Sequence, residues 1–190
     1  MNNDELKELI KRCAEQERSA QEQLFKLFYG KMMGVCMRYT KDRDRAQEVV
    51  QESFIKIFDK LADFDFKGSF EGWVRRIMVN ASIDAVRKRN REAFSTDEEY
   101  IFNGRSSFQE HDLDDDITKI KAEYAMEAIQ ELSPAYRTVF NLFVIENYSH
   151  QEIADILNIS EGTSKSNLAK AKQNLRKILS EKFVNLDHER

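Results

Sequence analysis

The segment 149–172 has the residue types of a surface that binds nucleic acid. It begins with a predicted capping box, in which the Ser149 and Glu152 side chains each cap the other's backbone amide. A three-residue turn separates this short helix from a longer basic one, which is the outline of a helix-turn-helix. The second helix is expected to present outward the side chains that can contact base edges or phosphates: Thr163, Lys165, Ser166, Asn167 and Lys170. A helical hairpin with an ordinary solvated basic face is the alternative.

A second group of residues combines aromatic rings with positive charge. The loop 62–68 contains Phe64 and Phe66. The helix predicted after it is expected to expose basic and polar residues: Arg75, Arg76, Asn80, Lys88 and Arg91. Such a surface suits single-stranded nucleic acid, because bases stack on aromatic rings while cations neutralise the backbone. The composition equally allows Phe64, Phe66 and Phe70 to be core residues.

A third group is acidic and surrounds one aliphatic residue, Ile55, on the helix predicted over 43–61. The polar members of this face are Glu48, Gln51, Glu52 and Asp59. Acidic residues are common on solvated helix faces, yet carboxylates around an exposed aliphatic also suit a basic protein partner. Both interpretations stay open on the residues alone.

The sequence offers no set of residues for catalysis or metal binding. It lacks a nucleophile paired with a base, a Gly-rich phosphate loop and ligands at metal-binding spacing. Cys13 and Cys36 each fall on an apolar helical stripe, so reduced core cysteines are expected. We therefore expect no enzyme activity, no metal and no cofactor. Apolar runs fall well short of the roughly 20 residues of a membrane span, so a cytoplasmic protein is expected.

The elements that must position these groups are all predicted to be helices. The 190 residues include only six Gly and one Pro, and apolar residues recur at the spacing of amphipathic helices. In the N-terminal half, helices are expected over about 6–13, 20–39, 43–61 and 69–88, closing into a bundle. The second of these is expected to turn Leu27 inward. The fourth is expected to turn inward the stripe of Trp73, Ile77, Ala81 and Ala85.

The C-terminal half is predicted to contain four more helices. The first covers about 120–132, and Ser133 caps a second that starts with the chain's only Pro and continues to about residue 146. The capping box opens the third helix, which is expected to end with Asn158 in the left-handed conformation. Ser160 is expected to cap the last helix. The predicted fold class is therefore all-α.

Charge divides the chain into two basic regions separated by an acidic one. The net charge is −4, but residues 75–91 hold six basic and one acidic residue, and residues 165–182 hold the same numbers. Between them, residues 92–123 hold ten acidic and three basic residues. Much of this stretch lacks helical periodicity, which is typical of a flexible, self-repelling linker. The predicted division is an N-terminal helical domain over 1–91, a flexible acidic linker over 92–118 and a C-terminal domain with the helix-turn-helix over 119–190.

Motifs in both halves resemble bacterial RNA polymerase sigma factors of the extracytoplasmic-function (ECF) type. The resemblance covers nearly the whole chain, as two blocks in the right order with the right gap. In the first block the matching segments are 46–54 (AQEVVQESF) and 70–73 (FEGW), with Asn80, Ile83 and Asp84. In the second they are 132–134 (LSP), 137–140 (RTVF), 152–154 (EIA) and 160–166 (SEGTSKS), with Ala171, Leu175 and Arg176.

The resemblance implies that the first block is sigma region 2, which binds core RNA polymerase and reads the −10 promoter element. Contacts with the clamp helices of the β′ subunit would be made by Glu48, Gln51, Glu52 and Ile55. The loop 62–68 would hold a base flipped out of the non-template strand, assisting DNA melting. The residues implied at the −10 element are Phe64, Phe66, Lys67, Arg75, Arg76, Asn80, Arg87 and Lys88.

The resemblance implies that the second block is sigma region 4, which meets the β flap of the polymerase and reads duplex DNA at the −35 element. The residues implied there are Thr163, Lys165, Ser166, Asn167, Ala169 and Lys170. Family members often have Val at position 164 and Arg at positions 167 and 170, where this chain has Ser, Asn and Lys. Since Lys offers a point charge in place of a bidentate fork, the family's −35 preference does not transfer.

The resemblance also implies partners beyond the polymerase and promoter DNA. An anti-sigma factor that clamps the two domains is common in the family, and a monomer is expected. The acidic net charge implies weak DNA binding by the free chain and strong binding once the polymerase positions both basic regions. Two alternatives remain. One is a free-standing helix-turn-helix regulator with an N-terminal sensing or dimerising bundle, which needs a palindromic site. The other is an interaction protein with no DNA role.

Overall fold

The computed structural model describes residues 2–89 and 116–188, with side chains described at 2–88 and 123–181. The chain forms two compact units, residues 1–88 and 89–190. Helices are the only regular elements in the described ranges, which confirms the all-α prediction. Most of the predicted linker lies outside the described residues. Within the described residues, no helix is both long enough and apolar enough to cross a membrane.

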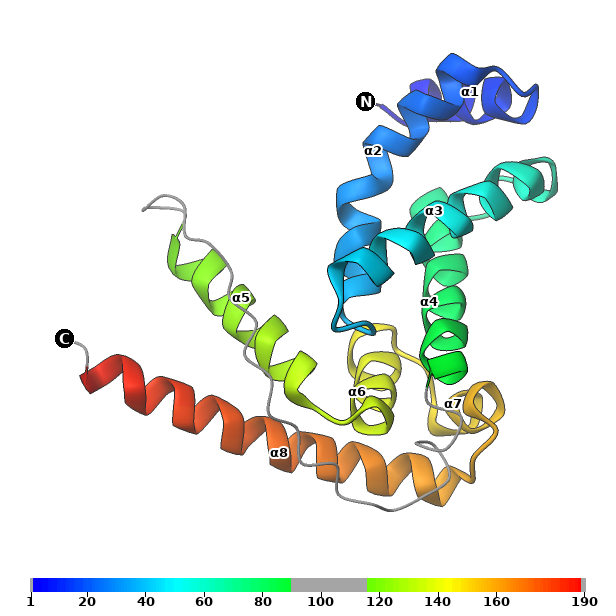
Figure 1. Ribbon diagram of the computed structural model, residues 1–190. Coiled ribbons are helices and arrows are strands. Elements are labelled where there is room, and N and C mark those ends of the chain that lie inside the picture. The colour runs from blue at the N-terminus through cyan, green and yellow to red at the C-terminus, as the bar shows by residue number, and fades with distance from the viewer. Residues whose placement is uncertain (1, 90–115, 189–190) are drawn as a thin grey trace. The chain divides into compact units, whose positions relative to one another are not determined.

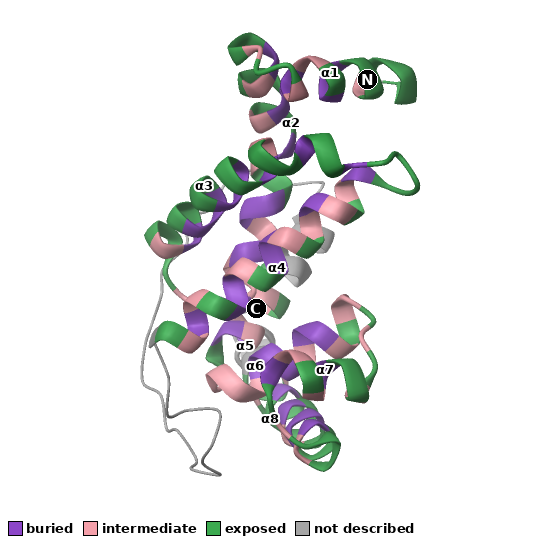
Figure 2. Ribbon diagram, turned by 90° about the vertical axis from the view of Figure 1, so that its right-hand side faces the viewer, coloured by how far each residue is buried: buried purple, intermediate pink, exposed green. Residues whose placement is uncertain are grey.

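The first unit contains four α-helices and a short 3₁₀ turn. They are α1 (Asn3–Ala14), α2 (Arg18–Met37), α3 (Arg43–Lys60), η1 (Leu61–Asp63) and α4 (Phe70–Arg89), drawn from blue to green in Figure 1. Helix α2 packs against α1 and α3, and α1 also contacts η1. Apolar residues from all four helices are buried, and the largest fully buried side chains include Ile10, Leu24, Tyr39, Phe54 and Met78. The inward faces are drawn purple in Figure 2.

Capping side chains fix where the helices of the first unit begin. Asn2 and Glu5 form a reciprocal capping box at α1. Asp42 caps α3 by accepting hydrogen bonds from the amides of Asp44 (2.9 Å) and Arg45 (3.4 Å). The predicted cap of α4 is confirmed, since Ser69 Oγ accepts from a backbone amide of the first turn at 3.2 Å. The start of α4 fixes where the preceding aromatic loop ends.

The predicted inward stripe of α4 is wrong by one position. Trp73, Ile77, Ala81 and Ala85 are only half-buried. The buried stripe is instead Phe70, Val74 and Met78, continued by Val79, Ser82, Ile83 and Val86. The two stripes have the same spacing, so periodicity alone cannot choose between them. Packing contacts decide which stripe is buried. The Phe70 ring lies 5.5 Å from the Phe28 ring and 5.2 Å from the Phe64 ring, and these contacts set the rotation of the helix.

Two other predictions for the first unit have definite outcomes. Leu27 is 44% exposed, because its neighbour Phe28 takes the position that packs against α4. Cys13 and Cys36 are buried free thiols, as expected for core cysteines, and burial raises the pKa of each to about 11. Thiols with such pKa values are largely protonated at neutral pH and so are poor nucleophiles.

The second unit also consists of helices. They are α5 (Asp116–Glu131), α6 (Pro134–Phe140), the π-helical segment η2 (Asn141–Ile145), α7 (His150–Leu157) and α8 (Glu161–His188), drawn from yellow-green to red in Figure 1. Helices α5, α6 and α7 all pack against α8. Their core includes Ala128, Leu132, Ala171 and Leu175. The helix predicted from Pro134 to about residue 146 thus ends in a π-helical segment, which sequence spacing did not indicate.

The predicted helix caps of the second unit are confirmed. Ser133 caps α6, and Ser149 and Glu152 form the predicted capping box at α7. Asn158 ends α7 with φ 54° and ψ 49°, the left-handed conformation that Asn tolerates better than most residues. Ser160 Oγ accepts from the amide of Thr163 at 2.9 Å, so α8 begins where predicted. Together these caps fix the turn between α7 and α8.

Candidate nucleic-acid and protein interfaces

Helices α7 and α8 form the predicted helix-turn-helix, and a partly buried polar contact joins their first turns. Ser164 is fully buried, and its Oγ lies 2.9 Å from Nδ1 of His150. The ring of Phe143 stacks on the imidazole of His150, with ring centroids 4.4 Å apart. His150 was not among the predicted site residues. The hydroxyl of Ser164 therefore has a polar partner inside the helix-turn-helix, which a Val at this position could not provide.

The outer face of α8 contains most of the residues predicted at the second nucleic-acid surface. Lys165, Ser166 and Ala169 are exposed, and Thr163 and Lys170 are half-buried. Asn167 is buried, so its predicted place on the outer face is wrong. Its position explains this, because it lies one turn after the buried Ser164 and four residues before the buried Ala171, on the inward side of the helix.

The basic side chains of α8 have different neighbours. The ammonium of Lys165 forms an ion pair with Glu161, with Nζ and Oε1 2.7 Å apart. The ammonium of Lys170 lies 5.9 Å from the ring centroid of Tyr136, and that of Lys172 lies 6.0 Å from the ring centroid of Phe143. Aromatic rings attract a cation without neutralising it, whereas a carboxylate does neutralise it.

The loop before α4 joins an aromatic cluster in the first unit. The ring of Phe64 lies 5.0 Å from that of Phe66, 5.2 Å from that of Phe70 and 5.4 Å from that of Trp73. Phe64 and Phe70 are buried, which confirms the core alternative for these two residues. Phe66 is 39% exposed, so its ring extends the buried cluster to the surface. A base could stack there on a ring that its neighbours already hold in place.

The backbone of this loop has an unusual conformation at Phe66, which has φ 59°. A bulky residue in the left-handed region is uncommon and costs on the order of 1 kcal/mol or more. Gly68 follows with φ 147°, a value open mainly to glycine. The Asp65 carboxylate braces the turn by accepting from the amide of Lys67 at 3.0 Å and pairing with its ammonium at 3.1 Å. Strain of this kind clusters at functional sites, although Gln16, in the turn between α1 and α2, also has a positive φ of 63°.

Helix α4 directly follows this loop, and its polar face contains the other predicted −10 residues. Arg76, Asn80 and Lys88 are exposed there, while Arg75 and Arg87 are half-buried. Arg91 lies outside the described residues. Each predicted −10 residue that is described, except the buried Phe64, therefore keeps at least part of its side chain accessible.

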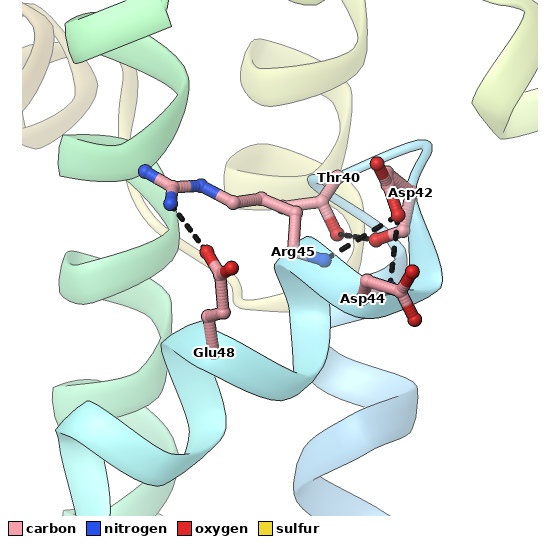
Figure 3. Close-up of polar contacts among 5 residues, drawn as sticks. All are labelled: Thr40, Asp42, Asp44, Arg45 and Glu48. Atoms are coloured by element: carbon pink, nitrogen blue, oxygen red, sulfur yellow. Dashed lines mark hydrogen bonds and ion pairs between the residues drawn. The ribbon is translucent and has the colours of Figure 1, made fainter.

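The acidic face of α3 is solvated and surrounds an exposed aliphatic side chain. Ile55 is 64% exposed, and Glu48, Gln51 and Glu52 are exposed with it. Figure 3 shows the start of this helix, where Asp42 caps the first turn and Arg45 forms an ion pair with Glu48. Single exposed aliphatic residues are common on protein surfaces, so the exposure of Ile55 is compatible with an interface and with an ordinary solvated face.

Comparison with known proteins matches both units to one family. Residues 24–92 match the model of Sigma-70 region 2, and residues 122–175 match that of Sigma-70, region 4. The chain is 27% identical over 180 residues to the ECF RNA polymerase sigma factor SigW of Bacillus subtilis, covering 92% of this chain and 96% of the relative. The chain belongs to the ECF type of RNA polymerase sigma factors.

Other relatives of this sigma factor agree in family and in fold. It is 25% identical over 189 residues to the RNA polymerase sigma-H factor of Pseudomonas aeruginosa, covering 94% of this chain and 96% of the relative. Its fold resembles that of the sigma factor RpoE from Bartonella quintana, solved in complex with the anti-sigma factor NepR. The TM-score is 0.51 at 23% identity, covering 84% of this chain and 96% of the solved chain.

The regions matched in this sigma factor contain all three candidate surfaces. The acidic face of α3, the aromatic loop and α4 up to Arg89 lie within residues 24–92, and the outer face of α8 lies within 122–175. Helix α1 lies outside both. The family consists of transcription initiation factors, which agrees with the lack of catalytic motifs in the sequence.

Proposed function

We propose that the two units read two promoter elements while the first unit holds core RNA polymerase. The observation that carries this proposal is that each unit exposes a surface whose chemistry suits nucleic acid, and that the two surfaces differ in kind. The first has an exposed aromatic ring on a strained loop beside cations, and the second has the polar outer face of a helix-turn-helix. The predicted division into 1–91, 92–118 and 119–190 forms part of this proposal.

The first surface is proposed to bind the single-stranded −10 element. Extruding a base from a duplex costs a few kcal/mol, so the protein must offer a stacking ring and cations in compensation. Phe66 offers the ring, supported by Phe64 and Phe70 behind it. Backbone phosphates would be neutralised by Lys67, Arg75, Arg76, Arg87 and Lys88, with Asn80 available for hydrogen bonds.

The second surface is proposed to bind the duplex −35 element in the major groove. A regular helix face can enter a groove about 12 Å wide without deformation of the protein. Lys165, Ser166, Ala169 and Lys170 are the residues of α8 proposed to contact it, with Thr163 near the first phosphates. Asn167 contributes to packing in the free protein and is set apart from this group by its burial.

The acidic face of α3 is proposed to bind the β′ clamp helices of core polymerase. Ile55 would be buried in the complex, while Glu48, Gln51 and Glu52 would meet basic groups of the partner. The second unit is proposed to contact the β flap. The Bartonella quintana relative was solved with an anti-sigma factor, and we propose a partner of that type here, with a monomeric, cytoplasmic sigma factor.

A pull-down with core polymerase tests the core-binding part of this proposal. The variant Gln51→Ala with Glu52→Lys is expected to weaken capture by at least about tenfold, since it inverts charge where electrostatic complementarity sets affinity. The matched control is Gln23→Ala with Glu22→Lys, which makes the same changes at exposed positions of α2. Unchanged capture by the α3 variant, or equal loss in the control, contradicts the assignment of this face.

A further inference from the structure

The first turn of α8 contains an internal ion pair at the place where the helix would meet DNA. Glu161 follows the capping residue Ser160 directly, and its Oε1 lies 2.7 Å from Nζ of Lys165, one turn later. Both side chains are more than half exposed. The hydrogen bond from Lys165 holds the pKa of Glu161 below its ordinary value, so the carboxylate is charged at neutral pH. His150 of α7 lies close enough to lower that pKa further.

A phosphate at this position would compete with Glu161 for Lys165. Backbone amides at a helix N-terminus favour a negative charge, and so does the lysine ammonium. Glu161 already pairs its carboxylate with Lys165 and places a negative charge in the first turn of α8. DNA that approaches α8 must therefore displace this carboxylate from Lys165 and tolerate its charge near the phosphates.

Lys172 makes a different contact on the same helix. It is exposed, and its ammonium lies over the ring of Phe143 at 6.0 Å. Since a ring leaves the charge of a cation intact, Lys172 can attract a phosphate without first breaking an ion pair. Lys165 lies at the centre of the surface proposed to read bases, so the residue closest to the specific contacts is the one whose charge is neutralised.

We propose that Glu161 is a specificity-determining residue that restrains Lys165 until DNA is correctly placed. This inference rests on the proposed function of α8 as the −35 reader. An exposed ion pair is weak and easily exchanged when a well-placed phosphate or base replaces the carboxylate. Loosely placed, non-specific DNA does not provide that replacement. The pair therefore lowers the affinity of the free chain for DNA at large more than its affinity for a promoter positioned by the polymerase.

The test compares the full chain with the variant Glu161→Gln in binding to a fluorescent mixed-sequence duplex of about 30 base pairs. The anisotropy titration runs from about 50 to 200 mM salt, the range in which phosphate contacts change affinity most clearly. Glu161→Gln is expected to tighten binding about fivefold at the lower salt concentration and to steepen the log–log salt slope by up to about 0.9. A role in fold stability alone would not steepen that slope.

The matched control is Glu181→Gln, which removes the same charge from an exposed position farther along α8. It is expected to change the affinity less than about twofold, because charges beyond a Debye length of about 10 Å are screened. Equal effects of the two variants overturn the proposal, since net charge alone would then explain the gain. Thermal unfolding of both variants checks that the second unit stays folded.

A double-mutant cycle with Lys165→Met separates this inference from the proposed function. The cost of Lys165→Met is expected to be about threefold larger in the Glu161→Gln background than in the native chain, because the freed lysine contributes more. An equal cost in both backgrounds overturns the restraint by Glu161 while leaving α8 as the DNA reader. No cost in either background, with Lys170→Met also silent, contradicts the proposed function itself.

Discussion

The two surfaces of this sigma factor that we propose to bind nucleic acid are built in opposite ways. In the first unit, the chain departs from regular structure at Phe66 and Gly68 to bring an aromatic ring to the surface. In the second, the surface is an uninterrupted face of α8, with no phenylalanine, tyrosine or tryptophan on its outer side between Thr163 and Lys170. A flipped base needs a ring beside a shaped loop, whereas a duplex needs a rigid rod that fits its groove.

Under the proposed function, this difference means that the protein binds single-stranded and duplex DNA through different interactions. Both surfaces are proposed to neutralise phosphates, so binding at both should depend on salt, but only the loop adds stacking on an aromatic ring, which depends on apolar contact. Each surface also has one lysine whose ammonium pairs with a nearby carboxylate. Lys165 pairs with Glu161 in α8, and Lys67 pairs with Asp65 in the loop.

The largest expected effects come from replacing Phe64 and Phe66, which should change different properties: stability for Phe64 and strand binding for Phe66. Phe64→Ala is expected to lower the free energy of unfolding of the first unit by about 3 kcal/mol, because it removes a buried ring. Phe66→Ala is expected to leave that free energy nearly unchanged and to weaken binding of a −10 single strand by about tenfold, within the 1–3 kcal/mol of a stacked base. Chemical denaturation and strand binding by the polymerase-bound protein measure the two effects. A loss of strand affinity without loss of stability in Phe64→Ala would reverse the roles assigned here.

The second prediction concerns salt dependence at α8. In the polymerase-bound protein on correctly placed −35 duplex, where Lys165 is released from Glu161, Lys165→Ala combined with Lys170→Ala is expected to flatten the log–log salt slope by up to about 1.8, corresponding to two phosphate contacts. Binding of core polymerase and of a −10 single strand should not change. The matched control, Arg176→Ala with Lys177→Ala, removes two exposed charges farther along the same helix. If the control flattens the slope as much, the DNA surface extends along α8 and the comparison with the loop must be redrawn.

The smallest expected effects come from the two serine caps. Ser69 caps α4 behind the loop, and Ser149 caps α7 before the recognition helix. Replacing either by Ala is expected to cost about 1 kcal/mol of unfolding free energy. Because the chain forms two compact units, each loss should appear in the unfolding of its own unit, followed by hydrogen exchange. Protection lost in both units from a single cap would show that they unfold together.

Local chemistry explains what the sequence could predict. The caps at Ser133, Ser149 and Ser160 and the left-handed Asn158 depend on a few neighbouring residues, so they were predictable without a structure. The exposed acidic face around Ile55 followed from helical periodicity for the same reason.

Features that depend on packing were not predictable. The rotation of α4 is set by the insertion of Phe70 between two other rings, so the Trp73 stripe and the Val74 stripe looked alike in the sequence. The positive φ of Phe66, the contact between His150 and Ser164 and the burial of Asn167 also depend on neighbours distant in the chain or on the rotation of α8. The Ser at position 164 was the one sequence signal that pointed toward the His150 contact.

In vitro transcription with a bacterial core polymerase on a library of promoter sequences tests the central claim most directly. The account predicts specific initiation from promoters that share two separated blocks of sequence. Lys165→Ala with Lys170→Ala should relax selection of the upstream block alone, and Phe66→Ala should impair use of the downstream block alone. Failure to initiate with any bacterial core enzyme, together with tight binding of a palindromic site by a dimer of the free chain, would contradict it.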